Sequence, residues 1–393
     1  MSRGDASLLR VRALFLLLGA AESAFVPFVP LLLHDRGLDA QALGAALALM
    51  SAVGFASGPL WGYLADRVIG RERTLALCLT GTVGGALLLA FAHGELALTL
   101  TGSVAWFFRS PNNALADALA LDRLGSHRRE AYGSIRLWMS ASFAVGAIAW
   151  GALIETAGIG VMAPLYAACT GLNALLVILV FHGRWPRPLE ADAATQSMRA
   201  VVAAPAFMLL LVAVFLSFAP YTATYNFAAV RIAALGGGAV FVGLAAGLQA
   251  AAEVPSMMAT RRLALRLRPA HIFALGAAFS VLVYAVWAVV ANPAALAAMR
   301  IVGGLGFGLT SVAMVVMVDE LVPVSLRATG QAAAKAVSMG FAPVVGLFGG
   351  GLIYGYLGAP SLFVVAGLLT VLAAVAARSA ETAQPGAVEH TSP

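Results

Sequence analysis

Ionisable side chains inside long apolar runs are the residues of this chain that could do chemistry. Glu22 and Glu253 supply carboxylates, and Arg109 and Arg136 supply guanidinium groups, each within a stretch that is otherwise apolar. A charge at the centre of a bilayer costs at least about 2.5–3.5 kcal/mol, so such residues face a partner or a polar cavity. The pattern indicates charge pairing and proton binding inside a membrane, and we expect no enzymatic activity.

Three polar residues recur at a spacing of four in one run, followed by a basic residue in the next. Arg109, Asn113 and Asp117 would share one face of a helix. The next helix runs back across the membrane, so Arg136 near its start lies at a depth similar to that of Asp117. We expect these four residues to contact a bound solute. A purely structural ion pair between Asp117 and Arg136 is the alternative.

Glu253 is the first candidate for binding a proton. Burial favours the neutral form of a carboxyl group and a nearby cation favours the charged form, so a buried acid can change between them. Pro255 follows, and its missing N–H loosens the preceding turn. Glu22 is the second candidate. The alternatives are a fixed ion pair with Arg300 for Glu253, and a polar contact between helix 1 and helix 5 or 7 for Glu22.

Two other features of the spans have both a functional and a structural interpretation. Arg300 stands near the outer end of its run and is expected to reach the membrane surface by snorkelling. Tyr221 and Tyr225 would share a helix face and could stack on a ring-bearing substrate. Packing inside the bundle or a position at the membrane interface is the alternative for the tyrosines.

The composition defines the class of protein to which these residues belong. The 393 residues are 61% hydrophobic and 11% charged, with a mean hydropathy of +0.91. This is far more apolar than a globular chain, so we expect an all-α integral membrane protein with about twelve transmembrane helices. The predicted spans are residues 12–33, 40–65, 74–92, 96–120, 133–155, 160–182, 205–230, 238–260, 271–291, 294–318, 329–352 and 358–377.

The chain divides near its middle into two related parts. We expect an N-terminal six-helix bundle over residues 1–182, a cytoplasmic linker over 183–204, a C-terminal six-helix bundle over 205–378 and a cytoplasmic tail over 379–393. Most of the 24 Lys and Arg residues fall at the termini and in loops on one side, which predicts cytoplasmic N- and C-termini. Pro59 and Asp66 correspond in position to Pro255 and Arg262, so the bundles are expected to be pseudo-symmetric, as in transporters built from repeats.

Other kinds of site are not expected. The 41 glycines follow no predicted strand and include no Gly-Lys-Ser loop, so they indicate close helix crossings rather than a nucleotide site. Cys78 and Cys169 lie in separate spans without metal-ligand spacing, so we expect no disulfide, no metal and no cofactor. The pI of 9.7 follows from the topology, and we expect no nucleic-acid partner.

A short motif at the end of the second span carries a family resemblance. Gly62-Tyr-Leu-Ala-Asp66-Arg67, followed by Gly70-Arg71-Glu-Arg73, resembles the signature of the major facilitator superfamily, with one extra residue before Gly70. The spacing of Gly58 and Gly62 predicts that two helix backbones approach closely here. The resemblance implies that Gly62, Asp66, Arg67 and Arg71 belong to a cytoplasmic gate. By the internal repeat, Asp319 and Lys335 are expected to form a second latch of that gate.

Further segments narrow the resemblance to the phenylpropionate permease-like group, which is akin to lactose permease and to nucleoside:proton symporters. They are Pro27-Phe-Val-Pro30, Arg36-Gly37-Leu38 with Gly44, Tyr132-Gly133-Ser-Ile-Arg136-Leu-Trp138, Glu253-Val-Pro255 and Leu326-Arg327-Ala-Thr329-Gly-Gln331. In lactose permease an acid on helix 4 and an arginine on helix 5 bind substrate. Arg136 aligns with that arginine, whereas Asp117 is about one residue out of register. Met139 stands where the group has glycine, which puts the packing of helix 5 in doubt.

The sequence therefore predicts a secondary active transporter that works by alternating access. We expect proton-coupled uptake of a small organic solute, an aromatic acid, a nucleoside or a sugar, by a monomer in the bacterial inner membrane. Its partners would be the solute, protons and the lipid bilayer. Proton-coupled efflux of drugs or metabolites is the first alternative, and a membrane sensor without transport activity is the second.

Overall fold

The computed structural model describes residues 3–124, 132–181 and 204–383, and every regular element in these ranges is a helix. Eleven segments are long and apolar enough to cross a membrane in the described part of the chain. The predicted linker lies almost wholly outside it, as does the tail beyond residue 383. The last helix ends at Thr382 rather than near residue 377, so the tail begins later than predicted.

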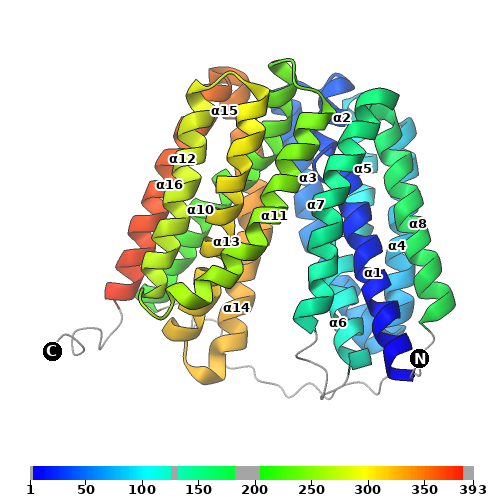
Figure 1. The fold of residues 1–393 in the computed structure, drawn as a ribbon, viewed down its shortest axis with the longest axis horizontal. Helices are drawn as coiled ribbons and strands as arrows, with labels where there is room; N and C mark the ends of the chain where they lie inside the picture. Colours follow the sequence, from blue (N-terminus) through cyan, green and yellow to red (C-terminus); the bar gives the residue numbers. More distant parts are fainter. Residues whose placement is uncertain (1–2, 125–131, 182–203, 384–393) are drawn as a thin grey trace.

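The helices before the linker are α1 (Arg3–Phe25), α2 (Val29–Asp35), α3 (Ala40–Tyr63), α4 (Arg71–Phe91), α5 (Glu95–Arg109), α6 (Asn112–Leu124), α7 (Tyr132–Ala157) and α8 (Met162–Val180). Those after it are α10 (Pro205–Ala234), α11 (Ala239–Leu263), α12 (Pro269–Val289), α13 (Pro293–Leu321), α14 (Arg327–Lys335), α15 (Ala342–Leu357) and α16 (Ala359–Thr382). In Figure 1 the first group, blue to green, stands beside the second, green to red. We refer to the two groups as the first and second halves.

The fourth predicted span is broken into two helices. α5 ends at Arg109 and α6 begins at Asn112, so neither piece alone has the length of a span. Pro111 lies between them, and proline has no N–H for the helical ladder and clashes with the turn before it. The stripe predicted for Arg109, Asn113 and Asp117 is therefore interrupted between its first two members, and the twelfth span is the kinked pair of α5 and α6.

The apolar core shows where the two halves join. One cluster of buried residues combines both halves, including Phe25 and Leu43 from the first and Phe227 and Trp287 from the second. Two further clusters of buried residues each belong to one half. The members of one lie between residues 11 and 181, and those of the other lie between residues 207 and 380. α1 begins and α16 ends on the same side in Figure 1, which we call the termini side. The shared cluster lies toward the opposite side, so the halves are held together there.

Glycine pairs allow the closest crossings between the halves. A Cβ atom on Gly151 of α7 would lie 2.7 Å from the main-chain oxygen of Ala239 in α11, and one on Gly44 of α3 would lie 2.7 Å from the Cα of Gly351 in α15. Small residues at such positions let helix backbones meet in lipid. Near the same end, Glu155 accepts a hydrogen bond from the main-chain N–H of Val240 at 3.3 Å. These contacts close the side opposite the termini.

Gly58 and Gly62 do not form such a crossing. No atom outside their immediate surroundings lies within 4 Å of the position that a Cβ would take at either glycine. The prediction of close helix packing at this pair is wrong for this conformation. The reason is that the shared core holds the halves together on the opposite side, which leaves the end of α3 on the termini side without a helix packed against these two glycines.

Candidate functional site

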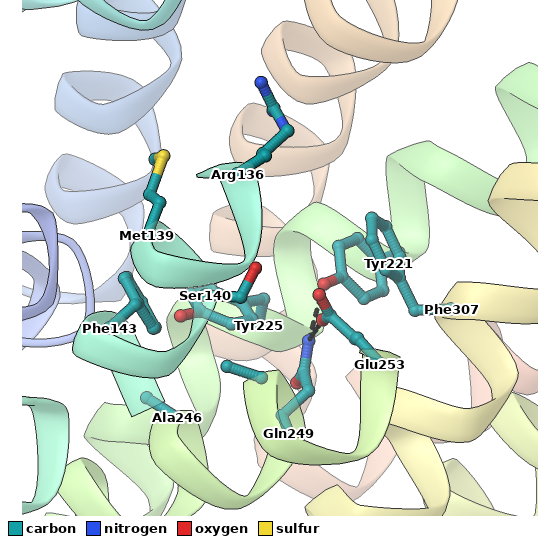
Figure 2. Close-up of a pocket in the computed structure, with 11 residues that line it drawn as sticks. Arg136, Met139, Ser140, Phe143, Tyr221, Tyr225, Ala246, Gln249, Glu253 and Phe307 are labelled. Atoms are coloured by element: carbon teal, nitrogen blue, oxygen red, sulfur yellow. Dashed lines mark hydrogen bonds between the residues drawn. The ribbon is translucent and has the colours of Figure 1, made fainter. Parts of the chain in front are cut away.

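A cavity of about 280 Å³ lies between the two halves, with α7 on one wall and α10, α11 and α13 on the other. Figure 2 shows Tyr221, Gln249 and Glu253 gathered on the second-half wall with Ser140 beside them, while the side chain of Arg136 on the first-half wall extends away from this group. The lining residues are Arg136, Met139, Ser140, Phe143, Tyr221, Tyr225, Ala246, Gln249, Ala250, Glu253 and Phe307. Small-ligand sites are concave and mostly apolar with a few convergent polar groups, and this cavity has that composition. It is the candidate substrate site.

The second-half wall carries a hydrogen-bonded polar network centred on Gln249. Its amide nitrogen Nε2 donates to Tyr221 Oη at 2.7 Å and to Glu253 Oε1 at 3.0 Å. Its amide oxygen Oε1 accepts from Nη1 of Arg300 at 2.6 Å. Gln249 is 3% exposed, so one buried amide connects the predicted proton-binding acid to a buried cation. The spacing of four residues on α11 places Gln249 and Glu253 on one helix face.

Arg300 does not reach the membrane surface, and the prediction that it snorkels is wrong. Its side chain is 7% exposed and lies over the rings of Tyr225 and Trp287, with the guanidinium carbon 4.8 Å from each ring centroid. Nη2 also donates to the main-chain oxygen of Tyr225 at 3.1 Å. The aromatic faces and neutral oxygens take the place of water around the cation, so its burial needs no exit to the interface.

Aromatic rings form the rest of this wall. The ring of Tyr221 stacks on Phe307, with centroids 4.6 Å apart, and lies 6.1 Å from the ring of Tyr225. Both tyrosines line the cavity, in agreement with their predicted position. Offset aromatic pairs of this kind present a flat apolar surface. The tyrosines therefore combine the packing role and the cavity-lining role that the sequence left as alternatives.

The first-half wall carries a direct ion pair. Nη1 of Arg136 donates to Oδ1 and Oδ2 of Asp117 at 2.6 and 2.5 Å, and contacts the hydroxyl oxygen of Tyr132 at 3.3 Å. The pairing agrees with the prediction from helix direction. The side chain of Arg136 is 48% exposed and lines the cavity, whereas Asp117 lies behind it and does not. Arg136 can therefore meet a solute directly, and Asp117 acts on it only through Arg136.

Glu22 and Arg109 form a second ion pair away from the cavity. Nη2 and Nε of Arg109 both donate to Oε2 of Glu22. The Arg109 guanidinium also lies 5.0 Å from the ring centroid of Trp106, and Glu22 is 5% exposed. The partner of Glu22 is thus on α5, which belongs to the fourth predicted span, rather than on the fifth or seventh predicted span. Asn113 has a buried amide oxygen without a hydrogen-bond partner in the described structure, and it does not line the cavity either.

The residues assigned to the gate lie at the termini side. A short π-helical turn (Leu64–Val68) carries Asp66, and Nε of Arg71 donates to its Oδ1 at 3.0 Å. Nη1 of Arg71 reaches Asp122 at 2.8 Å, so one arginine holds two carboxylates. Arg67 is exposed. π-helical turns occur frequently at functional sites, which fits a role for this corner in a conformational change.

The predicted second latch is not formed as a pair of Asp319 and Lys335. Asp319 accepts a hydrogen bond from Nε2 of Gln331 at 2.9 Å, and Lys335 is exposed without an ion-pair partner in the described ranges. α13 and α14 bring Asp319 closer to Gln331 than to Lys335, which stands one helical turn further along α14. This latch was predicted from the internal repeat, which does not define the turn between α13 and α14 that selects the partner of Asp319.

Six cavity residues were not singled out from the sequence: Ser140, Phe143, Ala246, Gln249, Ala250 and Phe307. Gln249 had a usable signal, because a polar residue four positions before a buried acid in an apolar span shares its helix face. Ser140, Phe143 and Phe307 had none, since serine and phenylalanine are ordinary residues of transmembrane helices. They belong to the site because their helices bring them to the cavity.

An all-helical bundle with a cavity between two halves is the architecture of many membrane transporters, and comparison with known proteins places the chain in that class. Residues 8–365 match the family model described as MFS_1 like family. This chain belongs to that family of the major facilitator superfamily, whose members are transporters rather than enzymes.

Several named proteins resemble the chain. Maltose permease of Geobacillus stearothermophilus is 30% identical over 276 residues, which cover 68% of this chain and 67% of the permease. The multi-drug resistance efflux pump PmrA of Streptococcus pneumoniae is 30% identical over 170 residues, 41% of each chain. The crystal structure of the nucleoside transporter NupG matches with a TM-score of 0.80 at 16% identity, covering 96% of this chain and 98% of NupG. At that identity the likeness shows the fold alone.

Proposed function

We propose that this chain is a proton-coupled uptake transporter for a small organic solute, a sugar, a nucleoside or an aromatic acid. The observation that carries the proposal is the cavity between the halves, with Arg136 on one wall and Glu253 on the other. A site at the interface of two repeats is where alternating access exposes a solute first to one side of the membrane and then to the other. The similarity to maltose permease supports a sugar as cargo, and the resemblance to nucleoside:proton symporters supports a nucleoside.

The cavity composition agrees with such a cargo. Its volume lies near the lower end of the range for small-molecule sites, and aromatic rings stand beside hydrogen-bonding groups. The rings of Tyr221 and Phe307 offer a stacking surface for a sugar or a base. Arg136 offers donors to hydroxyl, carbonyl or carboxylate oxygens.

We assign the termini side to the cytoplasm of a bacterial inner membrane, following the distribution of basic residues. The shared core then closes the outer side, and this conformation is the one from which solute leaves to the inside. Opening the outer side requires the crossing of Gly151 with α11 to separate. The ion pairs of Arg71 with Asp66 and Asp122 lie within the first half, where they brace the gate corner. The protein is proposed to act as a monomer.

Glu253 is the proposed proton site. A neutral Glu253 removes one negative charge from the cavity wall, so the reorientation of the halves no longer has to move that charge through the membrane field. That field is worth about 2.3 kcal/mol per charge per 100 mV, which is the scale on which an inward proton gradient can drive accumulation. Gln249, which also donates to Tyr221, holds the carboxyl group at the cavity wall.

Uptake by proteoliposomes tests the proposal. Labelled maltose, uridine and 3-phenylpropionate are offered with an imposed inward proton gradient, and accumulation of at least one above its external concentration is expected. Glu253→Gln should abolish accumulation and preserve exchange of solute down its own gradient. Glu95→Gln, which changes an exposed acid at the start of α5, is the matched control. Gradient-driven accumulation by Glu253→Gln at the wild-type level would contradict the proton site.

Efflux is the second candidate, and the similarity to PmrA is the observation that favours it. An efflux transporter would lower the intracellular level of its solutes and raise resistance when expressed. Expression in a drug-sensitive host with ethidium and norfloxacin separates the two functions. Raised resistance without accumulation of any of the three labelled solutes would favour efflux. A protein without flux of any of these compounds would support the sensor alternative.

A further inference from the structure

The hydrogen bonds around Gln249 have a direction that chemistry alone decides. A guanidinium group carries only donors, so the group that faces Arg300 must be the amide oxygen of Gln249. The amide NH₂ therefore faces the other way, toward Tyr221 and Glu253. This assignment does not depend on how the amide was placed, because the opposite orientation would direct N–H groups at N–H groups. The buried Arg300 thus orients an amide that is itself 3% exposed.

The orientation of the Gln249 amide makes the carboxyl group of Glu253 a hydrogen-bond acceptor. The hydrogen bond from Gln249 is the only one that Glu253 makes in the described ranges, and Glu253 is the acceptor in it. A protonated carboxyl group also has an O–H to donate. The oxygen of Gln249 accepts one hydrogen bond from Arg300, and the hydroxyl oxygen of Tyr221 accepts one from Gln249, so both have a partner within the wall.

The other charged and titratable groups around Glu253 offer no carboxylate acceptor either. Tyr221 and Tyr225 face it from α10, Arg300 faces it from α13, and Arg136 stands across the cavity on α7. Two of these groups are cations and two are phenols. Oε2 of Glu253 makes no hydrogen bond in the described ranges, and the carboxyl group lies at the cavity wall (Figure 2), so an O–H on this oxygen can meet an acceptor in the cavity.

We infer that Gln249 is a positioning residue that holds Oε1 of Glu253 and so directs a proton on Oε2 into the cavity, where a solute with a hydrogen-bond acceptor binds it. The substrate class is then a solute with hydroxyl, carbonyl or carboxylate oxygens, and a cation without any acceptor is excluded. This inference rests on the proposed role of Glu253 as the proton site. Gln249 couples proton binding to solute binding in this way: the O–H of protonated Glu253 donates to the solute, and the solute oxygen accepts from Glu253.

Infrared difference spectroscopy of the reconstituted full-length protein tests the role of Gln249 without any solute. Acid-minus-neutral spectra contain the C=O stretching band of each carboxyl group that takes up a proton, and the band lost in Glu253→Gln belongs to Glu253. The C=O group of Glu253 accepts from Gln249, so Gln249→Leu should shift this band to higher wavenumber. Gln249→Met serves as a second variant if Gln249→Leu does not fold.

A matched control removes a different glutamine that donates to a carboxylate. Gln331 donates to Asp319 at the termini side, so Gln331→Leu should leave the Glu253 band in place. A Glu253 band at the wild-type position in the folded Gln249 variants would overturn the positioning role. This result would leave the transport proposal standing, since solute accumulation is measured separately and without these variants.

Addition of solutes to the wild-type protein tests the substrate class. Saturating uridine or maltose should shift the Glu253 band to lower wavenumber, because the O–H gains an acceptor. Tetraphenylphosphonium, a ring-bearing cation without an acceptor, should leave the band unchanged. A band that responds to neither uridine nor maltose, or that disappears when the cation binds, would overturn the assigned substrate class. If neither sugar nor nucleoside is transported while the ligand-free band still shifts in Gln249→Leu, the cargo proposal fails and the role of Gln249 stands.

Discussion

The two walls of the cavity hold their charged groups in different ways. On the first-half wall, Arg136 is paired directly with Asp117, and its side chain is 48% exposed. On the second-half wall, Arg300 is 7% exposed and is separated from Glu253 by the neutral amide of Gln249. The first-half wall presents the cation Arg136 to the cavity. The second-half wall presents the acid Glu253, and the nearby cation Arg300 is buried and does not line the cavity.

The difference suggests a division of labour. An exposed ion pair is weak and can exchange its partner for a solute oxygen with little change in free energy. Moving a buried cation away from the oxygens it holds is costly, because those buried polar groups would lose their hydrogen-bond partner. We therefore expect the first-half wall to govern solute binding and the second-half wall to govern stability and proton coupling. Four predictions test this expectation, from the largest effect to the smallest.

Removing the buried cation should have the largest effect on stability. Arg300→Leu leaves the amide oxygen of Gln249 and the main-chain oxygen of Tyr225 without their donor, and the expected loss is about 3 kcal/mol of the free energy of unfolding. Thermal unfolding in detergent measures it. Arg300→Lys keeps the charge and should lose less. A wild-type unfolding temperature for Arg300→Leu would show that the two walls do not differ in this way.

Removing the exposed cation should affect binding rather than stability. Arg136→Ala should weaken the binding of the transported solute by about tenfold, which is about 1.4 kcal/mol. Its free energy of unfolding should stay within about 1 kcal/mol of the wild type, because the lost pair is exposed. Equilibrium binding and thermal unfolding of the same preparation give both values. Unchanged affinity together with a large loss of stability would assign Arg136 a structural role alone.

The corner at the termini side extends the comparison to rates. Asp66→Asn removes one of the two carboxylates that Arg71 holds, both exposed, so stability should change by about 0.5 kcal/mol at most. Solute binding should be unchanged and the rate of exchange should fall several-fold. Exchange of labelled solute across proteoliposomes measures the rate. Loss of folded protein would be evidence against a gating role for Asp66.

Asp117→Asn should have the smallest effect. The amide oxygen of asparagine still accepts a hydrogen bond from Arg136, and the carboxylate that is lost does not line the cavity. Solute affinity should therefore change by less than that of Arg136→Ala, by about threefold at most, or roughly 0.7 kcal/mol. Binding titrations of the solute with Asp117→Asn and with Arg136→Ala measure the two affinities side by side. An equal loss of affinity in both variants would show that the intact pair, rather than Arg136, binds the solute.

Much of the fold was predictable because it follows from the hydrocarbon that surrounds the chain in a membrane. Each predicted span has a helical counterpart, since a chain in hydrocarbon must satisfy its backbone hydrogen bonds within each segment. The pairing of Asp117 with Arg136 was also predictable, because consecutive antiparallel helices place residues near their shared loop at similar depth. The break at Pro111 was missed, although proline inside a span is a local signal that the sequence displays.

The partners of the other charged residues were not predictable. Glu22 pairs with Arg109, and Arg300 bonds Gln249, across helices that are not neighbours in sequence. A span that is apolar on all sides carries no periodic signal to show which face turns inward. The rotation of each helix about its axis, and with it the choice of partner, is therefore set only when the bundle packs.

The sequence by itself determined that this is a helical membrane protein, where its spans lie, that it resembles the major facilitator superfamily, and which residues place charge inside the membrane. The tertiary structure decided which of those charges meet in the cavity: it brought Arg136, Tyr221, Tyr225 and Glu253 there and kept Glu22, Arg109 and Asn113 away. The physical reason is that hydrophobicity acts along each segment, whereas contact between segments depends on helix kinks, helix rotation and the close crossings that glycine allows.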